Sequence, residues 1–508
     1  VDLCPVGALT AKPYAFMARP WELEKTESID IMDAQGCNTR IDTRGRAVLR
    51  ILPRINDAIN EEWLSDKGRH IWDGLARQRL DTAYVRKSGK LVPVSWHEAL
   101  AAVAARVKET RPERMAAIVG DLAAAEEIKA LKDLMAGLGV VNLDCRQEGA
   151  KIARGPRPTY LFNTTIAGVE AADAILLIGS NPRWEAAVLN ARIRKTWLAG
   201  PLKVAHIGEA RDLTYPVEQL GASVNVLDAL AEGSHPFAEV LRNAKRPMIV
   251  IGMGALARRD GAAILHRAAR IARETGVIGP AGTPAEGGWN GFNILHTAAS
   301  RVAALDLGFL PGEGGRDVAG IVDGAAKGEI DFIYLLGADE LPFEHIGRPF
   351  IVYQGSHGDA GANAADVILP GAAFTEKDGL FANFEGRAQE AQRAVFPPGE
   401  AREDWAILCA LAEALGRKLP YDTLEGVRAA LVAEAPQFWE LGDLPRHEGA
   451  DPNIWGAVGM DGPLDAEVPV VSAIADYYLT NPVARASSVM AECSRVFLHG
   501  GTERMAAE

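Results

Sequence analysis

The sequence predicts an α/β fold with two doubly wound units and parallel sheets. From Val94 onward, short apolar runs recur, and each leads into a glycine-containing loop and then an amphipathic helix. This alternation forms parallel sheets. The runs are apolar at every position, as expected for strands that helices cover on both faces. The predicted strands are Met115–Val119, Ala174–Ile178, Val204–Ile207, Met248–Ile251, Phe332–Leu336, Ile351–Tyr353 and Val367–Leu369, and the predicted helices include Trp96–Val107, Trp184–Trp197, Gly261–Thr275 and Ala406–Leu415.

Length and composition exclude several classes of protein. A chain of 508 residues should form roughly three domains of about 150 residues each. Its five cysteines are few and widely spread, which favours a reducing compartment over a secreted disulfide framework. A net charge of −13 argues against nucleic acid as a partner. No apolar run approaches the ~20 residues that cross a bilayer.

The first informative motif is Cys4-Pro5. A cysteine followed directly by proline is typical of the last ligand of a ferredoxin-type [4Fe–4S] cluster, because the thiolate binds iron and the proline fixes the turn. The alternative is a buried structural cysteine. The chain lacks an initiator methionine and begins inside this motif, so we expect an upstream part of the protein to precede it.

A small β-rich region is predicted next. Residues 41–52 alternate between apolar and polar side chains, and Arg44-Gly45 marks the turn of a hairpin. Further along, the strand Val367–Leu369 is stopped by Pro370-Gly371, and Lys377-Asp378-Gly379 signals a turn. We expect Phe381 and Phe384 to anchor a packed loop that ends in Gly386-Arg387.

Two motifs in the α/β region can be interpreted either as functional sites or as ordinary structural features of the fold. Gly252-x-Gly254-x-x-Ala257 follows a strand and opens a helix, and Glu274 lies near the spacing of a ribose partner, so the motif matches a dinucleotide fingerprint. Glycines at strand–helix turns are also commonplace in this fold, and we favour that interpretation. His357 lies in a glycine-containing loop, where a hydrogen-bonded loop histidine is favoured over a catalytic one.

The C-terminal part of the chain, from Glu403 onward, differs in composition from the α/β region. Glu403-Asp404-Trp405 opens a helix in which Cys409 faces an apolar core, and residues 436–469 are rich in Gly, Pro and Asp. We expect an extended segment that lies on a surface. The terminal helix is either a docking element for a partner or packs on its own domain.

The stretch at residues 365–389 resembles the loop by which molybdopterin oxidoreductases contact their pterin cofactor. It has the family pattern Ala-Asp-x-x-Leu-Pro followed by Glu-Lys-Asp-Gly-x-Phe-x-Asn-x-Glu-Gly-Arg. The resemblance implies a molybdopterin-oxidoreductase-like fold. Active members place a Cys, selenocysteine or Ser on molybdenum a few residues beyond the position of Cys145. Gln147 to Ile152 offer neither thiol nor hydroxyl, so we expect no molybdenum and a structural Cys145. Without the cofactor, we expect the pterin cleft to be closed and the loop 376–387 to be satisfied within the protein, with Arg387 paired to Glu376, Asp378 or Glu385.

Other strings are similar to the large iron–sulfur subunit family of respiratory NADH:quinone oxidoreductase (complex I). They are Cys-Pro-Val-Gly-Ala-Leu-Thr from Cys4, Ala-Arg-Pro-Trp at residues 18–21, and the tail segments 475–481 and 485–490. The resemblance implies that Cys4 is the fourth ligand of a [4Fe–4S] cluster whose other ligands lie upstream, together with further [4Fe–4S] and [2Fe–2S] clusters. It implies no catalytic or cofactor-binding site within this chain.

Many members of both families carry another [4Fe–4S] site with the spacing C-x2-C-x3-C-x27-C. In this chain the four positions fall on Asp30, Asp33, Cys37 and Ser65. Carboxylates and a hydroxyl are hard ligands and poor replacements for thiolates on iron–sulfur iron. We therefore expect a degenerate site without a cluster.

The family interpretation makes the chain an electron-transfer and scaffold subunit of the hydrophilic arm. Electrons from NADH, oxidised on a flavin subunit, would pass through its clusters and quinone-proximal iron–sulfur subunits to quinone. The expected location is peripheral, on the cytoplasmic side of a bacterial inner membrane, or on the matrix side in mitochondria. The alternatives are a catalytic molybdopterin oxidoreductase of the formate dehydrogenase type and an assembly protein without a redox role. The expected domains are 1–25 (end of a ferredoxin-like region), 26–82 (β-rich), 83–430 (α/β body) and 431–508 (irregular segment and helical extension).

Overall fold

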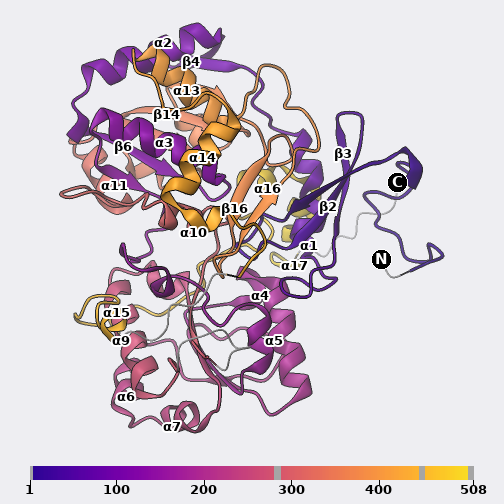
Figure 1. The fold of residues 1–508 in the computed structure, drawn as a ribbon, viewed down its shortest axis with the longest axis vertical. Helices are drawn as coiled ribbons and strands as arrows, with labels where there is room; N and C mark the ends of the chain where they lie inside the picture. Colours follow the sequence, from indigo (N-terminus) through magenta and orange to yellow (C-terminus); the bar gives the residue numbers. More distant parts are fainter. Residues whose placement is uncertain (1–3, 280–287, 445–451, 501–508) are drawn as a thin grey trace.

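The computed structural model describes residues 4–279, 288–444 and 452–500. Residues 1–3, at the start of the predicted ferredoxin-like end, and residues 445–451 and 501–508, in the predicted C-terminal extension, lie outside the described residues. Two large α/β lobes lie one above the other, and a smaller β-rich part projects beside their junction (Figure 1). Both predicted doubly wound units are therefore present.

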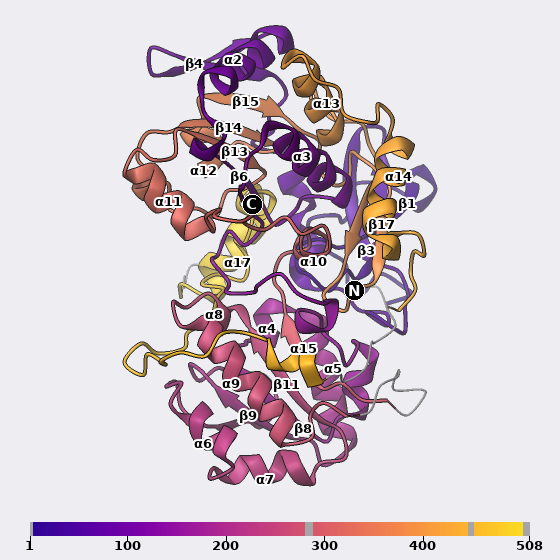
Figure 2. The same cartoon turned by 60° about the vertical axis from the view of Figure 1, so that its left-hand side comes forward.

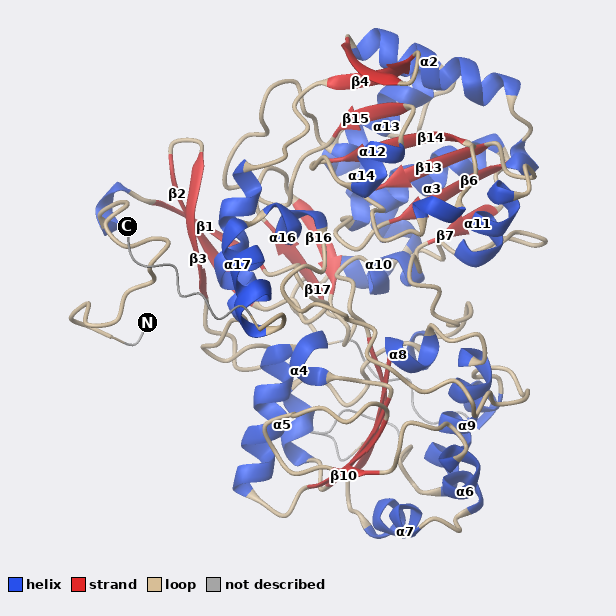
Figure 3. Cartoon of the chain, turned by 180° about the vertical axis from the view of Figure 1, so that it is seen from behind, coloured by secondary structure: helices blue, strands red, loops and turns tan. Residues whose placement is uncertain are grey.

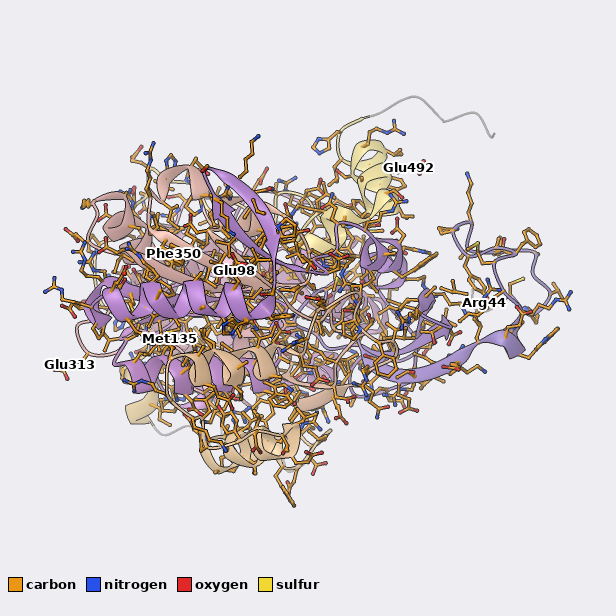
Figure 4. The ribbon with its side chains drawn as sticks, turned by 90° about the horizontal axis from the view of Figure 1, so that it is seen from above. Arg44, Glu98, Met135, Glu313, Phe350 and Glu492 are labelled. Atoms are coloured by element: carbon orange, nitrogen blue, oxygen red, sulfur yellow. The ribbon has the colours of Figure 1, made fainter. Side chains whose placement is uncertain are left out.

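The β-rich part is a three-stranded antiparallel sheet with the order β1-β2-β3. Its strands are β1 (Glu24–Ile29), β2 (Asn38–Arg44) and β3 (Ala47–Pro53). The predicted hairpin is confirmed: Gly45 has a φ of +61° in the turn, and Arg44 lies at its outer end (Figure 4). Helix α1 (Asp66–His70) and the 3-10 helix η2 (Ile71–Ala76) pack on β3.

The upper lobe contains a seven-stranded sheet with the order β5-β4-β15-β14-β13-β6-β7. The predicted parallel pairing is confirmed for β15, β14, β13 and β6, and β7 also pairs parallel with β6. Two strands that were not predicted add an antiparallel edge, where β4 pairs with β15 and β5 with β4. The tight turn at Ser88-Gly89, whose φ angles are 49° and 81°, reverses the chain and makes β5 antiparallel to β4. The strands are β4 (Ala83–Lys87), β5 (Lys90–Val94), β6 (Met115–Val119), β7 (Asn142–Asp144), β13 (Phe332–Leu336), β14 (Phe350–Gly355) and β15 (Val367–Pro370).

Helices cover both faces of this sheet (Figure 2). Alternate residues of its strands face two separate apolar cores, which explains why the strands are apolar throughout. Tyr334, for example, packs in one core and Ile333 in the other. One face carries α2 (Trp96–Glu109), α3 (Ala125–Leu138), α13 (Asp404–Ala414) and α14 (Leu424–Glu434), and the other α11 (Val318–Ala326) and α12 (Ala360–Ala364).

The lower lobe contains a fully parallel five-stranded sheet with the order β10-β9-β8-β11-β12. Its strands are β8 (Ala174–Ile178), β9 (Lys203–Ile207), β10 (Glu218–Gln219), β11 (Pro247–Gly252) and β12 (Phe292–Leu295). Its helices are α4 (Pro182–Glu185), α5 (Ala187–Ala199), α6 (Val226–Glu232), α7 (Pro236–Asn243), α8 (Met253–Leu256) and α9 (Gly261–Glu274). The helix expected over 184–197 is thus broken, because Ala186 has an extended φ of −155°.

The two lobes are not consecutive in the sequence. All strands of the five-stranded sheet lie between β7 and β13 of the seven-stranded sheet, so the lower lobe is inserted into the upper one. The strands of both lobes are visible from behind in Figure 3. The chain therefore passes between the lobes at both ends of this insertion, and the loops there come from both sheets.

The remaining elements include a second hairpin and the C-terminal helices. The expected loop at Phe381 is instead a hairpin of β16 (Gly379–Ala382) and β17 (Ala388–Ala391), although Phe381 and Phe384 are buried as predicted. The terminal helix packs on α1 and η2. The other helices are α10 (Arg301–Asp306), α15 (Pro452–Gly456), α16 (Pro482–Ala486), α17 (Ser488–Phe497), η1 (Pro20–Glu22), η3 (Pro112–Arg114), η4 (Arg157–Thr159), η5 (Ala167–Ala171), η7 (Phe343–His345) and η8 (Pro436–Phe438).

The irregular segment after Pro436 lies largely on the surface, as predicted, but buried apolar side chains anchor it, among them Phe438, Trp455 and Val458. Trp455 is 2% exposed and meets Phe292 edge to face, with the ring centroids 5.0 Å apart. Among the described residues, no helix is both long enough and apolar enough to cross a membrane.

Candidate functional site

The loop at Cys4 presents a half-buried thiol surrounded by backbone amides. The N–H of Ala8 donates to Sγ of Cys4 at 3.2 Å. The backbone N–H groups of Leu9 and Val6, and then those of Ala8 and Gly7, lower the pKa of the Cys4 thiol. Gly7 allows this close turn with a φ of +71°. A thiolate is the form of cysteine that binds metal, so the loop fits an iron ligand.

A wide pocket of 610 Å³ lies beside Cys4. Aromatic residues of the β-rich part line it, including Trp63 and Trp72. Apolar side chains of the N-terminal segment are strongly exposed around it: Val6, Leu9 and Phe16 are 83%, 65% and 102% exposed. The thiol therefore lies on an open face of the molecule and not in a core.

The structure brings the four positions of the degenerate site together. Asp30, Asp33, Cys37 and Ser65 are buried, with exposed fractions of 4%, 5%, 1% and 5%. Burial, and then the neighbouring charge of Asp33, raises the pKa of Asp30 to about 7. Burial, together with both carboxylates, raises the pKa of the Cys37 thiol well above its usual value. A protonated, buried thiol is a poor metal ligand.

Three of these positions now stabilise local structure. The hydroxyl of Ser65 accepts a hydrogen bond from the N–H of Gly68 at 2.9 Å and caps helix α1. Asp30 accepts from the N–H of Met32 at 3.0 Å, and Asp33 from the N–H of Gln35 at 2.9 Å. The side chains at these three positions therefore stabilise the local backbone.

A buried lysine, not expected from the sequence, lies beside these acids. Lys67 is 1% exposed, and its ammonium donates to the hydroxyl of Thr480 at 3.0 Å. It also lies 5.1 Å from the ring centroid of Tyr477. Burial lowers the pKa of Lys67, while the charges of Asp33 and Asp30 oppose that shift. The sequence signal was available, because Lys67 follows the fourth ligand position by two residues.

The region beyond Cys145 does not fit a molybdenum centre. Cys145 is 1% exposed, and burial raises the pKa of its thiol to about 12. Arg301 donates to the Cys145 carbonyl at 3.0 Å and pairs with Glu148 at 2.5 Å. These contacts hold the segment that would have to present a metal ligand, and residues 147–152 contain no thiol or hydroxyl.

For the two other candidates, the glycine motif at Gly252 and His357, the structure favours a structural role over a binding or catalytic one. A Cβ built on Gly254 would lie 2.2 Å from the carbonyl oxygen of Val471, so the protein's own chain covers this turn where a dinucleotide would approach. Glu274 lies exposed at the end of α9. His357 is 1% exposed and lies 3.0 Å from the carbonyl of Gly74 and 2.9 Å from the hydroxyl of Ser356, while burial, followed by the charge of Arg79, lowers its pKa to about 4.

The charged residues of the pterin-type loop pair within the protein. Nε of Arg387 lies 2.7 Å from Glu385, as expected for one of its three candidate partners. The other two candidates go elsewhere: Glu376 pairs with Arg79, and Asp378 accepts from the backbone N–H of Arg393. The ammonium of Lys377 lies between Glu127 at 2.7 Å and Asp404 at 2.6 Å. The expectation that the loop is satisfied internally is confirmed.

The expectation of a closed cleft is only partly right. Residues 473–481 cover the space between the lobes, but a cavity of 380 Å³ remains under them. Within the described parts of the chain, no three His, Cys, Asp or Glu side chains lie where they could hold a metal ion.

The fold and these sites define a class: a molybdopterin-oxidoreductase-type body joined to an iron–sulfur-type domain. Residues 79–414 match the family described as molybdopterin oxidoreductase. Residues 23–73 match the NADH-ubiquinone oxidoreductase NDSU1/NuoG-like 4Fe-4S domain, and residues 458–493 match the C-terminal region of the NADH-ubiquinone oxidoreductase G subunit. Acetylene hydratase from Pelobacter acetylenicus has a similar fold, with a TM-score of 0.53 at 11% identity over 92% of this chain and 78% of its own.

Closer relatives narrow the class to one family. The G subunit of NADH-quinone oxidoreductase from Rickettsia bellii is 45% identical over 97% of this chain and 69% of its own length. The mitochondrial NADH-ubiquinone oxidoreductase 78 kDa subunit of Candida albicans is 44% identical over 98% of this chain and 68% of its own length. The chain therefore belongs to the G-subunit family of NADH-quinone oxidoreductase. The predicted family, fold class and electron-transfer role in complex I are confirmed.

Proposed function

We propose that the contribution of this chain to electron transfer is made at Cys4, whose thiolate holds one iron of a [4Fe–4S] cluster. The other ligands come from outside the residues of this sequence. The cluster, when bound, supplies a one-electron carrier between NADH oxidation on a flavin subunit and quinone reduction. Cys4 holds the iron, and the amides of residues 6–9 hold the sulfur as a thiolate.

The observation that carries this proposal is the contrast between Cys4 and Cys37. The Cys4 thiol is half-buried, and backbone amides lower its pKa. Cys37 is buried beside two carboxylates that raise its pKa. Thiolate ligands need the first environment and not the second. The domain match over residues 23–73 thus reflects the fold of an iron–sulfur domain, and three of its four ligand positions carry no thiol.

The α/β body serves, in this proposal, as a scaffold without its own catalytic site and without molybdenum. Support comes from the blocked Gly254 turn, the missing metal ligand near Cys145 and the internally paired loop at 376–387. The formate dehydrogenase-type alternative needs the ligand that is missing. Purified protein should contain far less than one molybdenum per chain by elemental analysis, and a stoichiometric content would overturn this part.

The expected setting follows from the same proposal. The chain would contact the flavin subunit and quinone-proximal iron–sulfur subunits, as a peripheral subunit on the cytoplasmic side of the membrane or, in mitochondria, the matrix side. The proposed division is 1–25, 26–82, 83–430 and 431–508. Most of the three-stranded sheet, from the third residue of β1 onward, falls within the second part, and both α/β sheets fall within the third.

The test is a pair of matched cysteine variants in the complete subunit, measured in the assembled complex. Cys4→Ala should remove one [4Fe–4S] signal from the EPR spectrum and most NADH-to-quinone electron flow, since a missing thiolate ligand leaves a cluster labile. Cys37→Ala is the control and should leave every signal in place. A complete set of cluster signals in Cys4→Ala would disprove the assignment, and a signal lost in Cys37→Ala would disprove the degenerate site.

A further inference from the structure

Residues 470–487, which we call the clamp segment, contact all three parts of the molecule. In Figure 3, helices α16 and α17 lie between the β-rich part and the two lobes. Residues 473–476 and 479–481 of the segment line the cavity between the lobes. The clamp segment therefore runs along the crevice that separates the two sheets.

The start of the clamp segment is attached to the lower lobe by backbone hydrogen bonds. The N–H of Val470 donates to the carbonyl of Ala222 at 2.8 Å, and the N–H of Glu209 donates to the carbonyl of Val470 at 3.0 Å. Val471 follows so close to the turn after β11 that a Cβ on Gly254 would lie 2.2 Å from the Val471 carbonyl oxygen. The segment thus lies at the carboxyl ends of the strands, where doubly wound folds usually bind a dinucleotide.

Arg485 attaches the clamp segment to the upper lobe. Its guanidinium lies 2.7 Å from Glu340 and 2.5 Å from Asp359, which come from the loops after β13 and β14. It also donates to the carbonyl of Leu479 at 3.2 Å, within the segment itself. Charge-assisted hydrogen bonds of this kind are roughly twice as strong as neutral ones. Arg485 is therefore a strong attachment between the segment and two loops of the upper lobe.

The end of the clamp segment packs on the β-rich part. Thr480 accepts a hydrogen bond from Lys67 at 3.0 Å. Helix α16 approaches η2 so closely that a Cβ on Gly74 would lie 2.1 Å from the carbonyl oxygen of Val483 and 3.1 Å from the amide nitrogen of Ser487. The three heavy atoms nearest to that Cβ all belong to the clamp segment. A glycine at position 74 is therefore what allows the segment to lie this close.

We propose that the clamp segment holds the lower lobe, the upper lobe and the β-rich part together as one unit, from within the crevice where this architecture usually binds a dinucleotide. Its three attachments lie on one short stretch of chain, so displacing the segment at one part should loosen its attachment to the others. A segment that merely packs on the surface would lose only the contacts near the change. The inference does not depend on the role proposed for Cys4.

Hydrogen exchange of the full chain, followed by mass spectrometry, tests this coupling. The reporter is the amide of Glu209, whose hydrogen bond goes to the clamp segment at its lower-lobe end. Gly74→Ala adds one methyl group directed at the far end of the segment, and Arg485→Ala removes the upper-lobe attachment without adding bulk. Each should raise the exchange rate of the Glu209 amide about tenfold, the effect of losing one charge-assisted hydrogen bond or a comparable contact. Amides within β8 and β11 should keep their protection, because the sheet itself stays closed.

Matched controls separate release of the clamp segment from a general loss of stability. Gly200→Ala adds a methyl group into open space at an extended φ of −163°, and Arg495→Ala removes an exposed arginine of α17. Both should leave the exchange of the Glu209 amide unchanged. The proposal is overturned if that amide stays protected in both Gly74→Ala and Arg485→Ala, if the controls expose it equally, or if protection is lost to the same extent across β8 and β11.

Discussion

Lys67 and Thr480 lie 413 positions apart in the sequence, yet the lysine ammonium donates to the threonine hydroxyl at 3.0 Å. The contact joins the degenerate iron–sulfur site to the C-terminal segment that covers the cavity between the lobes. Asp30 and Asp33 supply the negative charge opposite the ammonium. The site, in which three of the four expected ligand positions carry no thiol, is thereby stabilised by charge and by the C-terminal segment.

Removing that ammonium should destabilise the protein. In Lys67→Met, the buried carboxylates of Asp30 and Asp33 lose their counter-charge, and the free energy of unfolding should fall by about 3 kcal/mol or more. Urea unfolding at pH 7.5 measures it. The double variant Lys67→Met/Asp33→Asn should recover part of the loss. Lys87→Met, which breaks an exposed pair with Glu98, should cost less than about 1 kcal/mol; an equal loss in both lysine variants would contradict the buried-charge argument.

Restoring the thiolates should restore the cluster. In the triple variant Asp30→Cys/Asp33→Cys/Ser65→Cys, the three new cysteines and Cys37 together have the C-x2-C-x3-C-x27-C spacing. Anaerobic reconstitution should then yield about four irons per chain and a reduced [4Fe–4S] EPR signal. The same variant with Cys37→Ala added is the control and should hold a labile cluster or none. If the triple variant takes up no more iron than the unmodified chain, the four positions do not form a cluster site in this fold.

Breaking the Arg387–Glu385 pair should cost stability without altering electron transfer. Both side chains are buried, so Arg387→Ala leaves an uncompensated carboxylate, at roughly 3–5 kcal/mol. Thermal unfolding and the yield of assembled complex should both fall, while cluster EPR signals in the complex that does assemble stay unchanged. Arg393→Ala, which removes a partly exposed partner of Glu403 at 3.4 Å, is the control and should cost less than about 1 kcal/mol. Normal stability of Arg387→Ala combined with slowed NADH oxidation would instead indicate a chemical role for the cleft.

Stability should fall with rising pH because of Glu185. Burial raises the pKa of its carboxyl in the folded protein to about 7, above the ordinary value of 4.5. Between those values the folded state binds more protons than the unfolded chain, so this contribution is full at low pH and is lost as pH rises through 7. Glu185→Gln should therefore gain at most about 3 kcal/mol over the unmodified chain at pH 8 and little at pH 5. Denaturant unfolding measures the difference; an equal gain at both pH values would refute it.

Much of the fold could be predicted because its signals are local. The strands Met115–Val119, Ala174–Ile178 and Phe332–Leu336 match the predicted bounds, since a run of apolar residues between a helix and a glycine turn fixes a buried strand. Errors arose where one backbone angle decides the outcome, as at the Ala186 break, or where a hairpin and a packed loop share one pattern, as at Phe381.

The same distinction between local and long-range signals applies to the candidate sites. Cys4, and the loss of ligands at Asp30, Asp33 and Ser65, could be seen from residue type and spacing alone. The Arg387–Glu385 pair could be seen too, because its members are two residues apart. Arg79 with Glu376, at a separation of 297 positions, and Lys377 between Glu127 and Asp404 could not, because each contact joins elements from distant parts of the chain.

The sequence by itself determined the fold class, the family resemblance and the chemistry of the lost cluster site, because these depend on periodicity and spacing within short segments. Only the tertiary structure decided that the lower lobe is inserted into the upper one, that Lys67 meets the C-terminal segment, and that Glu185 is fully buried beside Ser180. Each of these depends on which loops from two separate sheets meet at one junction. A local pattern gives the direction of a strand and not the identity of its distant neighbours, so those contacts are fixed when the two sheets pack.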